Sequence, residues 1–214
     1  MLRVPASALL TVLLIFPAFG LSTGPDFASI QPIHWYAQER AQIIEQHQPE
    51  TAHCTAWAFR QGKVLTWVTA YHCVATFPPI DGSFYIGNRP VQVIRTDAFL
   101  DLALFAGGPP NARGFALAKR APPPLTPIWA AGYPLGQHRL HVTAGVWSQG
   151  VDDDYMSVYN LGVTFGFSGG PVLNMRNQIV GIVQQKECWD LRGYCPMGRG
   201  ARLDQLRRFL LSYP

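Results

Sequence analysis

Residues 166–171, Gly-Phe-Ser-Gly-Gly-Pro, are the stretch of sequence on which the choice of fold depends. Glycines on both sides of Ser168 allow a tight turn and let backbone N–H groups approach a negatively charged oxygen closely. A serine hydroxyl is a poor nucleophile until a neighbouring imidazole accepts its proton. The stretch therefore predicts a reactive serine only if the chain also supplies a histidine and a carboxylate that orients it.

A histidine and an aspartate occur upstream of this turn, each beside an apolar run. His72 stands in Thr69-Ala-Tyr-His72-Cys73 after the run 64–68, and Asp101 leads into the run 102–105. Taken singly, the three residues could be a core histidine, a strand-end carboxylate and a serine in a plain turn, because Gly, Ser and Pro favour turns anyway. Together and in this order they contain the parts of a catalytic triad, His72, Asp101 and Ser168.

The composition favours an all-β protein. The 214 residues are 48% hydrophobic and 12% aromatic, which is enough for a full core and excludes a disordered chain. Only 14% of the residues are charged, while 20 Gly and 18 Pro provide many turns. The net charge is +4 and the 17 basic residues are spread along the chain, so no nucleic acid partner is expected.

Runs of β-branched and aromatic residues fall into two groups, separated by a Pro- and Gly-rich linker at 107–125. They predict a first β-barrel over 51–106, a second over 126–202 and a C-terminal helix over 203–214. Residues 21–50 are expected to form an N-terminal extension with a short helix in the stretch 30–48. The predicted strands are 55–59, 64–69, 83–86, 91–95, 102–105, 128–131, 140–147, 156–159, 171–174, 179–184 and 199–202.

The first twenty residues predict a secretory signal peptide. Arg3 supplies a positive charge, the apolar run 4–19 follows, and Ala18-Phe-Gly20 places small residues before a cut after Gly20. A membrane anchor would need about 20 unbroken apolar residues, and Pro17 interrupts this run. The mature protein is expected to be soluble, periplasmic or secreted, without a membrane partner.

Export favours disulfides between the four cysteines. Four cysteines allow three pairings, and proximity in the sequence favours Cys54–Cys73 and Cys188–Cys195. The alternative is a zinc site formed by the two His-Cys pairs at 53–54 and 72–73. Adjacent residues of a strand point to opposite faces, so these four ligands would converge poorly, and neither a metal nor a cofactor is expected.

The motifs around His72, Asp101 and Ser168 resemble those of the trypsin-like serine endopeptidases of the chymotrypsin fold. Asp-Leu-Ala-Leu at 101, Gly-Tyr-Pro-Leu-Gly at 132–136 and Val-Thr-Ala-Gly-Val at 142–146 resemble the bacterial HtrA/Deg-type branch. The resemblance covers roughly residues 51–210. It implies two six-stranded antiparallel β-barrels and a polypeptide substrate.

The same resemblance implies a role for each site residue. His72 would be the general base, Asp101 would orient it, and Ser168 would be the nucleophile. The N–H groups of Gly166 and Ser168 would form the oxyanion hole. The family's disulfide beside the catalytic histidine corresponds to the pairing Cys54–Cys73.

The chain also departs from the family pattern. Phe167 precedes the nucleophile where trypsin-like digestive enzymes have Asp and Deg-type enzymes usually have Asn. The mature start has no Ile/Val-Val-Gly-Gly segment, so maturation is expected to need only leader removal, and no PDZ domain is expected after residue 202. The large Phe167 keeps open a second interpretation, a catalytically silent binding protein on the same fold.

The substrate pocket is expected to lack a counter-ion for basic side chains. Its base, six residues before the nucleophile, is Gly162. Val163, Gln184 and Lys186 are predicted to line it, with Phe165 as a further wall. Lys186 would repel a basic side chain, so an apolar or small residue is expected before the cleaved bond.

Overall fold

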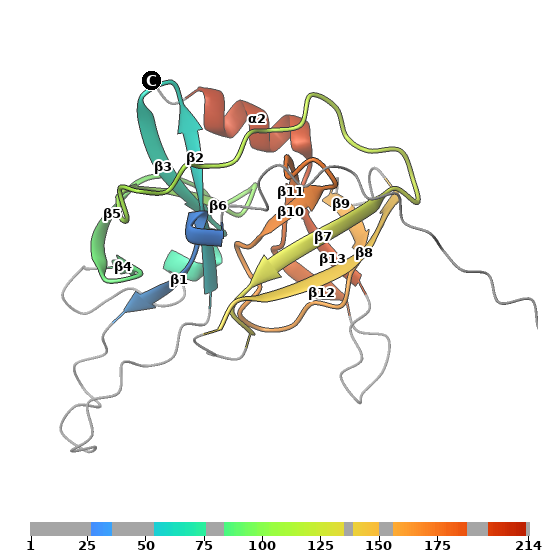
Figure 1. Cartoon of the computed structure of the whole chain (residues 1–214), viewed down its shortest axis with the longest axis horizontal. Coiled ribbons are helices and arrows are strands. Elements are labelled where there is room, and N and C mark those ends of the chain that lie inside the picture. Colours follow the sequence, from blue (N-terminus) through green and yellow to red (C-terminus); the bar gives the residue numbers. More distant parts are fainter. Residues whose placement is uncertain are drawn as a thin grey trace, which may run out of the picture.

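Antiparallel strands make up most of the computed structural model, which describes residues 27–35, 54–75, 84–134, 139–149, 156–187 and 197–212. Figure 1 shows two bodies of strands side by side, with one longer helix, α2 (Leu203–Leu211), along one side of both. None of the helices in these ranges has the length and apolar character needed to cross a membrane.

The first body is a closed barrel of six strands. The strands are β1 (Ile30–Trp35), β2 (Cys54–Gln61), β3 (Val64–Thr69), β4 (Phe84–Ile86), β5 (Arg89–Asp97) and β6 (Leu102–Gly107). Their order around the barrel is β1-β2-β3-β6-β5-β4, and pairing of β1 with β4 closes it. Apolar side chains such as Trp67 and Phe105, both fully buried, fill one of its core clusters. Two short helices, η1 (Phe27–Ser29) and α1 (His72–Ala75), flank the strands.

The helix predicted from residue 30 is wrong where the structure describes it. Residues 30–35 form β1, which pairs with β2 on one side and with β4 on the other. Ile30 and Ile33 are fully buried in the barrel that these pairings close. The strand pairings that close the barrel therefore stabilise these residues more than a local helix would. The first barrel begins at Ile30 rather than at residue 51. Residues 36–48 lie outside the described ranges.

The second body is a seven-stranded sheet in the order β11-β10-β7-β8-β9-β13-β12. Its strands are β7 (Pro127–Gly132), β8 (His141–Gln149), β9 (Met156–Asn160), β10 (Pro171–Asn174), β11 (Ile179–Ile182), β12 (Gln185–Glu187) and β13 (Met197–Ala201). The first and last strands of this order, β11 and β12, are separated in the chain by only residues 183–184. One continuous run thus reaches both ends of the sheet and curves it into a barrel. The predicted fold of two antiparallel barrels with a C-terminal helix is confirmed.

Two segments connect the barrels at their surface. The stretch 108–126 crosses from one to the other (Figure 1) and makes single bridges to both, Phe59 with Phe115 and Leu117 with Ile179. Helix α2 buries Leu203, Leu206, Phe209 and Leu210. The guanidinium of Arg95 in β5 donates to the Phe209 carbonyl at 2.9 Å and lies over its ring at 4.6 Å.

Candidate active site

His72 is held in place by a single carboxylate. It follows β3 as the first residue of α1, and its backbone N–H donates to Asp101 Oδ1 at 2.8 Å. Its ring Nδ1 lies 2.8 Å from Asp101 Oδ2. Because an ionised carboxylate only accepts, Nδ1 carries the proton and Nε2 is left as an acceptor. One side chain therefore fixes the position, the ring plane and the tautomer of His72.

The loop that carries Asp101 is anchored from the second barrel. Asp101 has φ 51°, a left-handed conformation that is unfavourable for a residue with a side chain. Gln184 donates from its amide to the carbonyls of Leu100 (2.7 Å) and Asp101 (2.5 Å). Its own Oε1 accepts the N–H of Ala201 at 2.6 Å. These bonds hold the loop in its strained conformation.

Gln184 thus has a supporting role that was not predicted, and its place in the substrate pocket stays a prediction. The side chain is only 3% exposed, and its amide is engaged with backbone groups of both barrels. It supports the loop of Asp101, and it also lines the cavity beside the His72–Asp101 pair.

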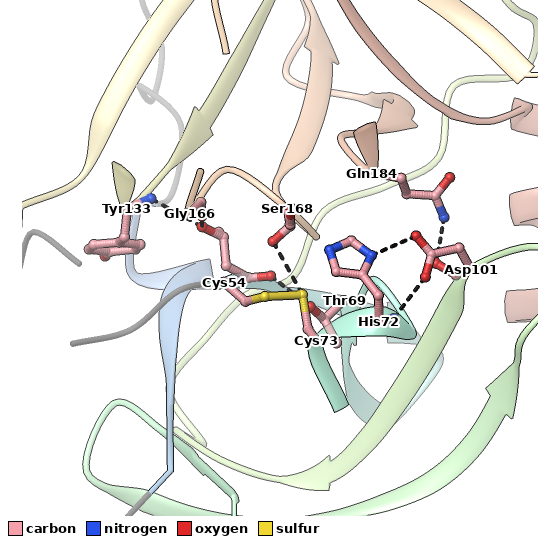
Figure 2. The surroundings of a disulfide bond; sticks show 10 residues. Cys54, Thr69, His72, Cys73, Asp101, Tyr133, Gly166, Ser168 and Gln184 are labelled. Atoms are coloured by element: carbon pink, nitrogen blue, oxygen red, sulfur yellow. Dashed lines mark hydrogen bonds and ion pairs between the residues drawn. A yellow bond between two sulfur atoms is a disulfide. The ribbon is translucent and has the colours of Figure 1, made fainter. Parts of the chain in front are cut away.

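Ser168 lies on the opposite side of the His72 ring from Asp101. Figure 2 shows the imidazole between the two, with its second nitrogen on the side of Ser168. The Ser168 carbonyl accepts the N–H of Thr55 at 2.8 Å, and Cys73 Sγ is 3.9 Å from the same oxygen. The structure therefore brings the three predicted residues together. Within the described ranges no hydrogen bond joins the Ser168 hydroxyl to His72, and such bonds often tighten only when substrate is present.

Two backbone N–H groups of the serine turn have no partner among the described residues and could bind a substrate oxygen. The Phe167 carbonyl accepts the N–H of Gly170 at 2.7 Å, and the Gly166 carbonyl accepts the hydroxyl of Thr55 at 2.7 Å. Across the part of the chain that the structure describes, the N–H groups of Gly166 and Ser168 have no hydrogen-bond partner. This is the state that an oxyanion hole requires before substrate binds.

The side chain of Phe167 points away from the catalytic residues. It is 4% exposed and belongs to a core cluster of the second barrel. A Cβ atom added to Gly132 would lie 2.9 Å from its ring, which shows how closely β7 packs against it. Burial of this ring anchors the turn that carries Ser168 without filling the cleft.

The other pocket predictions have different outcomes. Gly162 is exposed, and among the described residues a Cβ atom there would meet only Thr143 Oγ1, at 3.9 Å, so they leave space beside it. The prediction for Val163 is wrong: it is 4% exposed and lies in the second core, because neighbouring residues of an extended segment alternate in direction. The backbone of Lys186 pairs with Gly198, and its side chain lies outside the described part. Phe165 is 64% exposed, and its contact with substrate stays a prediction.

A cavity of about 670 Å³ opens beside the His72–Asp101 pair. Tyr71 and Phe99, which were not predicted as site residues, line it together with both residues of the pair. Phe99 is 92% exposed, and a lone aromatic residue in a turn carries no sequence signal for such a place.

The disulfide between Cys54 and Cys73 is present, as predicted. It joins the start of β2 to the residue after His72, over a separation of 19 residues. The sulfur atoms of Cys54 and Cys73 and a ring nitrogen of His72 lie within 4.8 Å of one another. Since both sulfurs are already bonded, they cannot act as thiolate ligands, which excludes the zinc alternative built on them. Cys188 and Cys195 lie outside the described residues.

Cys54→Ser is expected to lower the free energy of unfolding by about 3 kcal/mol, since a loop of this size is no longer closed in the unfolded chain. Peptide hydrolysis should fall as well, because the strand end before His72 loosens. Chemical denaturation measures the first effect. The double variant Cys54→Ser/Cys73→Ser should match the single one, and an unfolding free energy equal to that of the parent would contradict the prediction.

Two barrels with a His–Asp pair and a serine turn at their junction place the chain in the class of trypsin-like peptidase domains. A sequence profile of the trypsin-like peptidase domain matches residues 54–182, and the chain belongs to this family. The resemblance seen in the sequence is thereby confirmed. Comparison with curated protein sequences gave no significant match.

Solved protease structures share the fold. The serine endoprotease from Yersinia pestis superposes with a TM-score of 0.66 at 15% identity, over 86% of this chain and 62% of that one. The chain thus spans less than two thirds of the length of that protein. The active form of the Rv3671c protease from M. tuberculosis gives a TM-score of 0.65 at 17% identity, over 87% and 81%.

Proposed function

We propose that the chain is an exported serine endopeptidase. The observation that carries the proposal is the His72–Asp101 pair, with Nδ1 and Oδ2 2.8 Å apart and the free side of the ring toward Ser168. The Ser168 hydroxyl attacks the carbonyl of a peptide bond while His72 Nε2 takes its proton. The N–H groups of Gly166 and Ser168 stabilise the oxyanion. His72 then protonates the leaving amine, and water hydrolyses the acyl-enzyme by the same route.

A fluorophosphonate probe tests this proposal, because it labels only an activated serine. We expect stoichiometric labelling of the native protein, with the label on Ser168 in peptide mapping, and none after heat denaturation. The alternative, a silent binding protein, predicts peptide binding without labelling. The side chain of Phe167, which favoured this alternative, is buried in the core, and this supports the peptidase.

Export is part of the proposal. The leader predicted at residues 1–20 supports it, and so does the Cys54–Cys73 disulfide, because such bonds persist in oxidising compartments. N-terminal sequencing of the protein from a periplasmic or culture fraction should find Leu21 first. A chain that retains Met1 in the cytoplasm would refute this part.

The enzyme is expected to cleave after apolar or small residues. Gly162 offers space but no carboxylate, and burying an unpaired charge costs on the order of several kcal/mol. Profiling of cleavage sites in a proteome-derived peptide mixture measures this preference. Gly162→Asp should add cleavage after Arg and Lys, whereas the neutral Gly162→Asn should not. A majority of cuts after Arg or Lys by the unmodified enzyme would be the opposite result.

A further inference from the structure

Thr55 connects both barrels to the turn that carries the nucleophile. It lies in β2 and is fully buried. Its hydroxyl donates to the Gly166 carbonyl at 2.7 Å and accepts the N–H of Tyr133 at 3.1 Å. Its backbone N–H donates to the Ser168 carbonyl at 2.8 Å. One residue of the first barrel therefore holds the carbonyls of both residues whose N–H groups would bind the oxyanion.

These carbonyl contacts determine how the turn presents its donors. A peptide unit is planar, so holding a carbonyl also fixes the N–H of the next residue, which points the opposite way. The peptide between Phe167 and Ser168 is set by the bond from Gly170 to the Phe167 carbonyl. Gly166 lacks a Cβ atom and would otherwise rotate easily. The Thr55 hydroxyl is the described partner of its carbonyl, so it fixes the peptide between Gly166 and Phe167 and restrains the backbone rotation at Gly166.

We propose that Thr55 is a positioning residue for the oxyanion hole, an inference that rests on the proposed peptidase function. Its buried hydroxyl fixes the peptide that joins Gly166 to Phe167. This restrains the backbone at Gly166, whose own N–H belongs to the preceding peptide, and so keeps that donor beside the substrate oxygen. Its bond from Tyr133 ties the same hydroxyl to the end of β7. The first barrel thus supplies His72 and Asp101 and also holds the donors that the second barrel contributes.

The test compares Thr55→Val, which keeps the shape of the side chain, with Thr55→Ser, which keeps the hydroxyl. The substrate is a fluorogenic peptide of the sequence cut most often in the profiling experiment, and the inhibitor is the aldehyde of the same peptide. Ser168 Oγ adds to the aldehyde carbon, its proton moves to His72, and the resulting oxyanion occupies the hole. Thr55→Val should lower kcat about 10²-fold, as loss of an oxyanion donor does, and weaken aldehyde inhibition by a similar factor. The KM of Thr55→Val should change by less than about threefold. Thr55→Ser should stay within about threefold of the parent in kcat, in KM and in the inhibition constant of the aldehyde.

Thr69→Val is the matched control. Thr69 is also fully buried, and its hydroxyl donates to the Thr55 carbonyl at 2.9 Å without contacting Gly166. Both valine variants should lose roughly 2–10 °C in Tm, but only Thr55→Val should weaken aldehyde inhibition. If Thr55→Val does not fold, Thr55→Ala replaces it, with the same expected loss relative to Thr55→Ser.

The outcomes separate this proposal from the proposed function. An active parent whose Thr55→Val and Thr55→Ala variants match Thr55→Ser in kcat and aldehyde inhibition would overturn the role of Thr55 alone. A parent that neither hydrolyses peptides nor reacts with the fluorophosphonate would overturn the peptidase and this inference together.

Discussion

Ser168→Ala is expected to reduce peptide hydrolysis by a factor on the order of 10⁴ or more without unfolding the protein. The hydroxyl has no hydrogen-bond partner among the described residues, so its removal leaves no buried group unpaired. The turn itself is held by backbone contacts, such as the bond from Thr55 to the Ser168 carbonyl, which alanine preserves. Substitution of Ser168 should therefore abolish hydrolysis while leaving the free energy of unfolding nearly unchanged.

The two partner residues give matched versions of this experiment. His72→Ala should lose a comparable factor in kcat, and the double variant with Ser168→Ala should be no worse, because the two act as a unit. Asp101→Asn should lose about 10⁴-fold, since an amide NH₂ facing Nδ1 favours the wrong tautomer of the imidazole.

Hydrolysis of casein and of a defined peptide measures activity, and chemical denaturation verifies that each variant is folded. Retention of the parental rate by Ser168→Ala would show that the triad assignment is wrong. Traces of parent enzyme are excluded by the fluorophosphonate, which should not label the Ser168→Ala preparation.

The strands and the three chemical motifs were predictable because both are local properties of the sequence. Alternating apolar residues mark strands such as β3, and short signatures mark His72 and Ser168. β1 was missed because residues 30–35 precede a stretch of helix-forming residues, and only the gap between β2 and β4 makes them a strand. Pro32 gave no sign against a helix, because proline is tolerated in the first helical turn.

The roles of Thr55 and Gln184 depend on contacts between residues far apart in the chain. Thr55 and Gly166 are 111 positions apart, and Gln184 is 83 positions from Asp101. Both residues lie in strands or strand ends where a polar residue is unremarkable. Which backbone carbonyl such a side chain meets depends on how the two barrels dock, and no local pattern carries that information.

Gly169→Ala is expected to lower the free energy of unfolding by about 3–5 kcal/mol, from the left-handed backbone and the overfilled site combined. Gly169 has φ +82°, and a Cβ atom there would lie 2.2 Å from Thr69 Oγ1 and 2.3 Å from the Thr55 carbonyl oxygen. Its N–H meanwhile donates to the Val183 carbonyl at 2.6 Å. The residue is thus fixed by one barrel and in contact with the other, so neither side has room to move.

Gly62→Ala separates the two causes. Gly62 also has a positive φ, +59°, but no atom of the described residues lies within 4 Å of an added Cβ atom. Its variant should lose only about 1–2 kcal/mol, the cost of the left-handed conformation alone. If Gly169→Ala folds at all, its serine is displaced from His72, and a shift of about 1 Å costs about 10²-fold in rate. Chemical denaturation of both variants measures the difference in the free energy of unfolding. Equal losses in the two variants would contradict the close packing of this turn against β2 and β3.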